Sequence, residues 1–304
     1  MIDINKIAVL GGDQRQFTAA RILEKKIPKK FFFWGIFDSK CTDDAHTWCD
    51  SYGDAIAEAS VVILPLPVSI DGVYLNCPSC GMSENVRLST IIDCMENNTL
   101  LIGGRIPAKL YESAEKKGIR VKDYFLSEDF QIQNAYITAE AALSIAMNSL
   151  DKNICGADVA VTGYGRISKH LVRLLKGLGA NVTVAARKDS DLAWGFSQGC
   201  SVLKLGDAPE CRENIYKLAN GYDVIYNTVP CRLFERAFLE RADKKTFIID
   251  LASAPGGVDI CAAKELGSNV LWATSLPGKY APASAGKIIA QCVGNILESE
   301  VGGV

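Results

Sequence analysis

The stretch V-A-V-T-G-Y-G-R-I-S-K-H-L, Val159 to Leu171, decides the fold because it joins an apolar run, two glycines and a helix-like tail. Gly163 permits a tight turn after a strand, and Gly165 removes the side chain that would block a diphosphate. Ser168 stands where a third Gly or Ala is usual and is small enough for helix and strand to approach closely. The helix N-terminus offers free N–H groups and a positive dipole end, so the stretch predicts a dinucleotide-binding turn.

The next strand carries a basic pair at its end. N-V-T-V-A-A-R-K ends in Arg187 and Lys188, about twenty residues past the glycines, where this fold reads the adenosine ribose. An Asp or Glu there accepts hydrogen bonds from the ribose hydroxyls, whereas an Arg pairs with a 2′-phosphate. The pair therefore favours NADP over NAD. The alternative is a solvated loop that touches no ligand.

Strand-like apolar runs alternate with helical patterns almost from end to end, which predicts parallel sheets covered by crossover helices. We therefore expect an α/β protein with two doubly wound, Rossmann-like domains and a cleft between them. In the first half, strands are expected at residues 7–10, 31–34, 61–64, 99–102 and 119–121. In the second half, they are expected at residues 158–162, 181–185, 201–204, 223–226, 246–250 and 270–272.

The predicted domains follow this rhythm. An N-terminal α/β substrate domain is expected over residues 1–135, and the NADP-binding domain over 151–282. A linker helix is expected over residues 136–150, because Thr138 is a suitable N-cap followed by an acid and strong helix formers. The last helical segment, within 283–304, has no strand after it and fits either domain.

Composition excludes several classes of protein. The chain has 304 residues, 48% of them apolar and 22% charged, which is typical of globular domains. Its net charge of -2 gives no basic field for nucleic acid or an anionic membrane. No apolar run approaches the roughly 18 to 20 residues of a membrane span, and nothing marks the N-terminus for secretion. We expect a cytoplasmic protein that acts on a small molecule.

The cysteines predict no disulfide framework. Their number, 11, is odd, and they are scattered through a long chain. Cys77 and Cys80 form a C-x-x-C pair, which holds zinc or exchanges disulfides in other proteins. A zinc site needs a second pair, and Cys41 and Cys49 are poorly spaced for one. We expect no metal and reduced thiols in a surface loop.

Two more turns follow strands of the second half. N-T-V-P ends at Pro230, and D-L-A-S-A-P-G-G begins at Asp250. Because the carboxyl edge of a doubly wound sheet holds the nicotinamide half of its ligand, we place Thr228, Pro230 and Ser253 in the cofactor site. Ordinary turn chemistry is the alternative for both.

The first half has a similar junction, I-A-V-L-G-G-D-Q-R, without G-x-G-x-x-G spacing. It predicts no second dinucleotide site. Together with Ser69, at the end of the turn after another strand, Gly12, Asp13 and Arg15 are candidates for a substrate wall. The alternative is that these are two tight turns without a ligand.

The two histidines, His46 and His170, disfavour a hydroxy-acid dehydrogenase. Such an enzyme needs an imidazole to take the hydroxyl proton. His46 lies in a polar loop, and His170 lies on the helix after the glycines, where it faces the helix surface or its packing. A reaction that aromatises a dihydro ring demands less of the protein, and orientation supplies most of its catalysis.

Collected together, the motifs resemble those of the dipicolinate synthase A-subunit family along nearly the whole chain. They are I-A-V-L-G-G-D-Q-R-Q from Ile7, L-P-L-P-V-S from Leu64, T-A-E-A-A-L from Thr138, V-T-G-Y-G-R-I-S from Val161, N-T-V-P from Asn227, D-L-A-S-A-P-G-G-V-D from Asp250 and L-P-G-K-Y-A-P-A-S-A-G-K from Leu276. The G-x-G core is generic, but the first and last motifs in combination are far more specific.

The resemblance implies an NADP-binding subunit that, with a flavoprotein-like B subunit, converts dihydrodipicolinate or a hydrated precursor into dipicolinate in the mother cell of a spore former. It implies a formate/glycerate dehydrogenase-like fold whose C-terminal helix, 283–304, returns to the first domain, and an assembly of several copies. The cofactor then lies on Gly163, Gly165, Arg166, Ile167 and Arg187.

A dicarboxylate substrate also needs cations, and Lys279 joins Arg15 as a candidate, with a solvated loop lysine as the alternative. Two other functions stay open. The chain is either a non-catalytic NADP-binding subunit that regulates or assembles its partner, or a generic 2-hydroxy- or amino-acid dehydrogenase.

Overall fold

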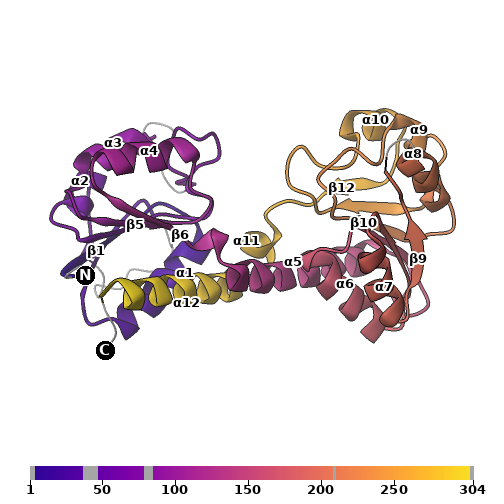
Figure 1. Ribbon diagram of the computed structural model, residues 1–304, viewed down its shortest axis with the longest axis horizontal. Helices are drawn as coiled ribbons and strands as arrows, with labels where there is room; N and C mark the ends of the chain where they lie inside the picture. The colour runs from indigo at the N-terminus through magenta and orange to yellow at the C-terminus, as the bar shows by residue number, and fades with distance from the viewer. Residues whose placement is uncertain (1–3, 37–46, 79–84, 208–209, 302–304) are drawn as a thin grey trace. The chain divides into compact units, whose positions relative to one another are not determined.

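The computed structural model describes residues 4–36, 47–78, 85–207 and 210–301. The chain divides into two compact units. Unit 1 comprises Met1–Asn134 and Ala281–Val304, and unit 2 comprises Ala135–Tyr280. Each contains one parallel six-stranded sheet with helices on both faces, so both are doubly wound α/β folds of the Rossmann type (Figure 1). The predicted fold class is confirmed.

Unit 1 places its strands in the order β3-β2-β1-β4-β5-β6. They are β1 (Lys6–Leu10), β2 (Lys30–Trp34), β3 (Thr47–Trp48), β4 (Val61–Ile63), β5 (Leu100–Gly103) and β6 (Arg120–Asp123). The helices are α1 (Gln14–Lys26), α2 (Tyr52–Ile56), α3 (Leu88–Cys94), α4 (Ala108–Lys116) and α12 (Pro282–Val301), with the 3-10 turn η2 (Tyr124–Leu126) after β6.

The core of unit 1 follows from the alternation of side chains along β1. Ile7 and Val9 point to the face covered by α1 and α12, while Ala8 and Leu10 point to the face covered by α2, α3 and α4. All four are fully buried, as expected for a strand covered on both faces. Helices α1 and α12 lie side by side, so segments far apart in the sequence pack together in this unit (Figure 1).

Unit 2 repeats the same strand order, β12-β11-β10-β7-β8-β9. Its strands are β7 (Asp158–Thr162), β8 (Asn181–Ala186), β9 (Ser201–Lys204), β10 (Val224–Asn227), β11 (Phe247–Asp250) and β12 (Val270–Trp272). Its helices are α6 (Arg166–Gly177), α7 (Asp189–Ser197), α8 (Glu210–Ile215), α9 (Arg236–Leu239), α10 (Ile260–Glu265) and α11 (Leu276–Tyr280), with the 3-10 turn η3 (Tyr216–Leu218) after α8.

The helix between the two units starts earlier than the sequence predicted. Helix α5 runs over Glu128–Ser149, not from residue 136. Thr138, the predicted N-cap, is buried inside the helix. Two acids, Glu128 and Asp129, occupy the first turn, where they stabilise the positive end of the helix dipole. The sequence feature that indicates the start of α5 is therefore this pair of acids, which the prediction did not use.

Candidate functional site

The turn between β7 and α6 leaves bare backbone at the carboxyl edge of the unit 2 sheet. Gly163 has a φ of +82°, and a Cβ there would come within 2.8 Å of Thr228 Oγ1, so the position requires glycine. Gly165 is the N-cap of α6, and a Cβ at this residue would meet nothing within 4 Å. The protein therefore tolerates a side chain at Gly165 but does not place one there.

The other residues of the turn hold it in place. Tyr164 points into the core, and burial raises the pKa of its phenol. Ser168 is fully buried, and its Oγ lies 2.9 Å from Thr228 Oγ1. The Thr228 hydroxyl in turn donates to the Thr162 carbonyl at 2.9 Å. The small residue that replaces the third glycine thus ties α6 to the end of β10.

A crevice of about 540 Å³ opens beside this turn within unit 2. It is lined by Gly163, Ala186, Arg187, Lys188, Asp191, Leu205, Gly206, Asp207, Ile215, Tyr216, Val229, Pro230, Cys231, Arg232, Leu233, Glu235 and Phe238. Four predicted cofactor residues are thus brought together: Gly163, Arg187, Lys188 and Pro230. The other five are not among the lining residues: Gly165, Arg166, Ile167, Thr228 and Ser253. Ile167 packs on the core, and Ser253 lies in the turn after β11.

Charges in the crevice are balanced. The Arg187 side chain is 67% exposed, and its Nη1 lies 3.7 Å from Asp207 Oδ1, whose side chain is 91% exposed. Lys188, beside it, is the N-cap of α7. The lining includes three cationic side chains, Arg187, Lys188 and Arg232, and three carboxylates, Asp191, Asp207 and Glu235. The basic pair is available to a ligand, but Asp207 competes for its charge.

A buried polar network joins the ends of three neighbouring strands beneath this edge. Thr162, Asn227 and Asp250 are each fully buried. The Thr162 hydroxyl donates to Asn227 Oδ1 at 2.6 Å, and Asn227 Nδ2 donates to Asp250 Oδ1 at 2.7 Å. Because these residues end β7, β10 and β11, the network fixes the relative positions of the loops that follow the strands.

Asp250 organises the glycine-rich turn after β11. Its Oδ1 accepts from Ala252 N at 3.1 Å, and its Oδ2 accepts from Gly257 N at 2.7 Å and Val258 N at 3.2 Å. A Cβ at Gly257 would overlap Asn227 Nδ2, so the close approach requires glycine. The sequence predicted that this turn lines a ligand pocket. It did not indicate that the buried Asp250 and Asn227 side chains fix the turn through hydrogen bonds.

In unit 1 the candidate residues also lie in a turn between a strand and a helix, but here a side chain caps the helix. Asp13 is the N-cap of α1, and its carboxylate accepts from Arg15 N at 3.0 Å. The Arg15 guanidinium returns to the same carboxylate, Nε to Oδ1 at 2.9 Å and Nη2 to Oδ2 at 2.8 Å. Nη2 also donates to the Leu66 carbonyl at 2.6 Å. The predicted substrate cation is therefore held by the protein itself. Gly12, with a φ of +97°, leaves no room for a Cβ.

The two remaining substrate candidates are Ser69 and Lys279. Ser69 caps its own loop, since its Oγ accepts from Gly72 N at 2.9 Å and donates to Asp71 Oδ1 at 3.0 Å. Lys279 belongs to unit 2, where it is exposed on α11.

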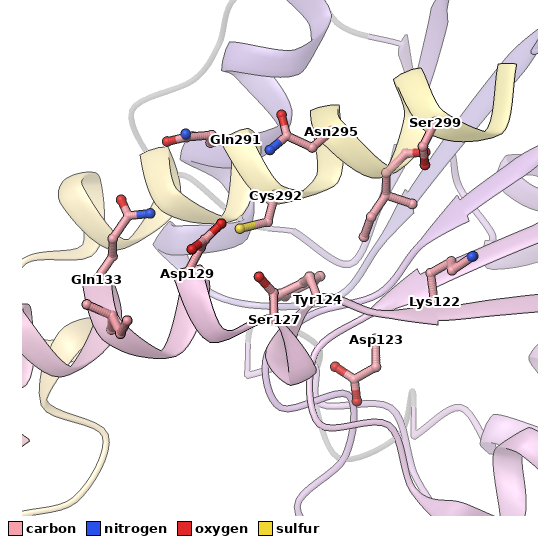
Figure 2. Close-up of a pocket in the computed structure, with 12 residues that line it drawn as sticks. Lys122, Asp123, Tyr124, Ser127, Asp129, Gln133, Gln291, Cys292, Asn295 and Ser299 are labelled. Carbon is pink, nitrogen blue, oxygen red and sulfur yellow. The ribbon is translucent and has the colours of Figure 1, made fainter. Parts of the chain in front are cut away.

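A second cavity, of about 500 Å³, lies within unit 1. Figure 2 shows that its labelled residues come from β6, η2 and the start of α5 on one side and from α12 on the other. Its polar lining is mostly neutral, with Gln133 on α5 and Gln291 and Asn295 on α12. None of the predicted site residues belongs to it.

His170 and Cys77 have clear surroundings. The His170 ring packs edge-on against Tyr136 at 5.3 Å between centroids, which confirms that it faces the packing of its helix. Cys77 is disulfide-bonded, so the expected reduced thiol is wrong for this residue. His46, Cys41 and Cys80 lie outside the described residues. Across the described ranges, no group of three or more His, Cys, Asp or Glu side chains is placed to hold a metal ion.

Comparison with known proteins bears on this geometry. The family described as the N-terminal domain of the dipicolinate synthase A subunit matches residues 6–125. The dipicolinate synthase A subunit of Bacillus subtilis is 29% identical over 293 residues, which is 96% of this chain and 95% of the relative. The crystal structure of the dipicolinate synthase A subunit from Bacillus halodurans superposes with a TM-score of 0.84 at 26% identity, over 98% of this chain and 99% of that one.

Over nearly its whole length, the chain is similar to dipicolinate synthase A subunits. The resemblance inferred from the motifs is thereby confirmed. More distantly, D-lactate dehydrogenase from Escherichia coli shares the fold, with a TM-score of 0.64 at 14% identity over 98% of both chains. This likeness shows a shared fold, the doubly wound parallel sheet. Among the described helices, none has the length and apolar character needed to cross a membrane.

Proposed function

We propose that the chain is the NADP-binding oxidoreductase subunit of a dipicolinate synthase, which converts dihydrodipicolinate or its hydrated precursor into dipicolinate during sporulation. Similarity to dipicolinate synthase A subunits supports the product, and the fold shared with a dehydrogenase supports the class of chemistry. When bound, NADP⁺ would supply a hydride acceptor. The dihydro ring would lose a hydride and a proton as it becomes aromatic, and a hydrated precursor would lose water as well.

The β7–α6 turn carries this proposal. At Gly165 an added Cβ would enter open space, whereas at Gly163 it would collide with Thr228. The absence of a side chain at Gly165 therefore serves no packing purpose within the described part of unit 2. A diphosphate that lies over Gly165 accounts for it, because the backbone N–H groups at the start of α6 then bind phosphate oxygens directly.

Arg187 and Lys188 would bind the adenosine end of the cofactor. Both line the crevice beside Gly163, and the exposed guanidinium of Arg187 suits a 2′-phosphate. Asp207 opposes this preference, since its carboxylate lies next to the same guanidinium. We therefore propose NADP as the cofactor, with a preference over NAD that Asp207 moderates.

The protein's part in the reaction is chiefly orientation. Asn227 and Asp250 fix the loops at the carboxyl edge, where the nicotinamide half would lie. His170 is occupied with Tyr136 on the side of α6, so it is unsuited to the acid–base role that a hydroxy-acid dehydrogenase requires. We further propose that the chain acts in the cytoplasm on a small dicarboxylate, as a homo-oligomer that works together with a B subunit.

Gly165→Ala tests the cofactor site. The added methyl fits the protein, so the melting temperature should stay unchanged, but it lies in the path of the diphosphate. NADP affinity should fall about tenfold to a hundredfold, as for an overpacked contact. Gly177→Ala is the matched control, because it also adds a Cβ to open space, at the other end of α6, and should leave NADP affinity unchanged.

Both affinities are measured by calorimetry on the whole chain. A native chain that binds neither NADP⁺ nor NADPH, or a Gly165→Ala variant that binds as well as the native chain, refutes the cofactor site. Absorbance at 340 nm with dihydrodipicolinate, for the chain alone and with its partner subunit, then separates a catalytic subunit from one that only binds the cofactor.

A further inference from the structure

The hydroxyl of Tyr124 is buried without a hydrogen-bond partner among the described residues. The residue begins η2 directly after β6 and is 1% exposed. Its hydroxyl is buried and forms no hydrogen bond with any part of the chain that the structure describes. A buried hydroxyl without a partner destabilises the protein, and a phenylalanine would fill the same space without this cost. The hydroxyl therefore requires an explanation.

The phenol end of Tyr124 lies at the carboxyl edge of the unit 1 sheet. A Cβ at Gly104 would come within 2.8 Å of both Tyr124 Cζ and Leu66 Cδ1. Gly104 directly follows β5, and Leu66 lies in the loop after β4. The glycine thus makes room for the ring beside the loop that follows β4, and β4 pairs with β1 at the centre of the sheet, where the strand order changes direction. In doubly wound sheets, ligands bind at this switch point.

Arg15 lies at the same corner. Its Nη2 donates to the carbonyl of Leu66, and its Nε and Nη2 bind Asp13. Nη1 is left without a hydrogen-bond partner in the described ranges. Burial raises the pKa of Tyr124, and the Arg15 guanidinium opposes that rise, so the two groups are within electrostatic reach. The Arg15 side chain is only 10% exposed and that of Asp13 is 36% exposed, so solvent reaches this corner mainly beside Asp13.

Two hydrogen-bond donors at one corner of unit 1 thus lack an acceptor among the residues that the structure describes. We propose that this corner is a carboxylate-binding subsite, in which Arg15 Nη1 and the Tyr124 hydroxyl donate to one carboxylate of the ligand as it enters. Asp13 is the positioning residue, because its two oxygens fix the plane of the guanidinium and leave Nη1 for the ligand.

The surrounding charges favour a carboxylate over a phosphate. Asp13 and Asp123 both lie within electrostatic reach of the Tyr124 hydroxyl and repel a dianion more strongly than a monoanion. Asp123 is itself occupied, since its oxygens accept from Arg105 N and Ile106 N. The choice of pyridine-2,6-dicarboxylate as the ligand rests on the proposed function, whereas the subsite rests on unit 1 alone.

The test is calorimetric titration of the whole chain with pyridine-2,6-dicarboxylate. Tyr124→Phe removes only the hydroxyl and should weaken binding about tenfold to a hundredfold, the range for a lost hydrogen bond to a charged group. Its melting temperature should stay the same or rise, because the hydroxyl has no partner in the described part of the free protein. Tyr111→Phe, which removes a half-buried phenol on α4, is the control and should bind as the native chain does.

Unchanged dicarboxylate affinity in Tyr124→Phe overturns the proposal, and a lower melting temperature in that variant would show that the hydroxyl binds a structural water instead. A native chain that fails to bind the dicarboxylate at millimolar concentration overturns it as well. Arg15→Lys keeps the charge and loses the planar fork, so it should weaken the same titration. NADP titrations of the same samples report on unit 2 independently, which distinguishes a failed subsite from a failed cofactor site.

Discussion

Replacing Asp250 by Asn should destabilise unit 2 strongly, although the two side chains have almost the same shape. The Asp250 carboxylate accepts four hydrogen bonds: one from the amide of Asn227 and three from the backbone N–H groups of Ala252, Gly257 and Val258. An amide has one oxygen, so its NH₂ group must face two donors whichever way it is turned. Two bonds to a charged group are lost, at about 1.5–3 kcal/mol each. The expected loss is therefore about 3–6 kcal/mol.

Rearrangement of Asn227 does not rescue the variant. If its amide turned over to accept from the new NH₂ group, the Thr162 hydroxyl and Val229 N would lose their acceptor, Asn227 Oδ1. Water cannot readily replace that acceptor, because all three side chains that form the network are fully buried. A loss of this size is a large part of the stability of a typical domain, about 5–15 kcal/mol.

The assay is a urea titration followed by hydrogen exchange of peptides from β10 and β11, which reports on unit 2 without the contribution of unit 1. Asp259→Asn is the matched control. Asp259 caps α10 by accepting from Ala262 N at 3.0 Å, and Asn caps helices equally well, so this variant should lose less than about 1 kcal/mol. A loss below about 1 kcal/mol for Asp250→Asn would show that the hydrogen-bond count is the wrong basis for the estimate.

Two other predictions concern charge. Arg187→Asp should move the preference from NADP toward NAD by roughly a hundredfold, because a carboxylate replaces the partner of the 2′-phosphate, while Asp207→Asn should raise NADP affinity by a few-fold. Paired calorimetric titrations with NADP and NAD check both, and an unchanged ratio in Arg187→Asp would place the phosphate elsewhere. Glu300 on α12 pairs with Lys122 at 2.9 Å and Arg120 at 2.6 Å, and its hydrogen bond to Lys122 is the main reason that its pKa lies below the usual 4.5. A carboxyl group whose pKa is lower in the folded state stabilises that state at pH values above its unfolded-state pKa. The native chain should therefore melt at a higher temperature than Glu300→Gln at pH 7, and this difference should shrink as the pH falls below about 4.5. A difference that grew toward acid pH would contradict the pairing.

Most strands were predictable from the sequence, because the central parallel strands are buried on both faces and are continuous apolar runs. Residues 158–162 match β7 to the residue, and residues 201–204 and 270–272 match β9 and β12, which are largely exposed edge strands. The two-residue β3 and the five-residue α2 were missed, since elements this short carry too few residues for a periodic pattern. The start of α5 was missed for another reason: Thr138 is a good N-cap by type, but the helix had already begun at the acids of residues 128 and 129.

At the candidate site, the sequence predicted which loops carry the site residues but not which side chains contact one another. Gly163, Arg187, Lys188 and Pro230 line one crevice because strand order brings the ends of β7, β8 and β10 together. Two contacts depend on three-dimensional placement that spacing alone does not reveal. The pairing of Arg187 with Asp207 crosses from β8 to the loop after β9, and Tyr124 reaches Gly104 from the end of β6.

The turn after the first strand of each unit differs in the residue that caps the following helix. Both units wind their strands in the same order, and both open their first helix directly after a glycine turn. In unit 1 the cap is Asp13, whose own carboxylate satisfies the start of α1 and adds a negative charge. In unit 2 the cap is Gly165, which has no side chain to do so. The start of α1 is thus occupied by a carboxylate, which repels phosphate, whereas the start of α6 is left open. The proposed nucleotide is therefore expected in unit 2 and not in unit 1, although both units have the same strand order.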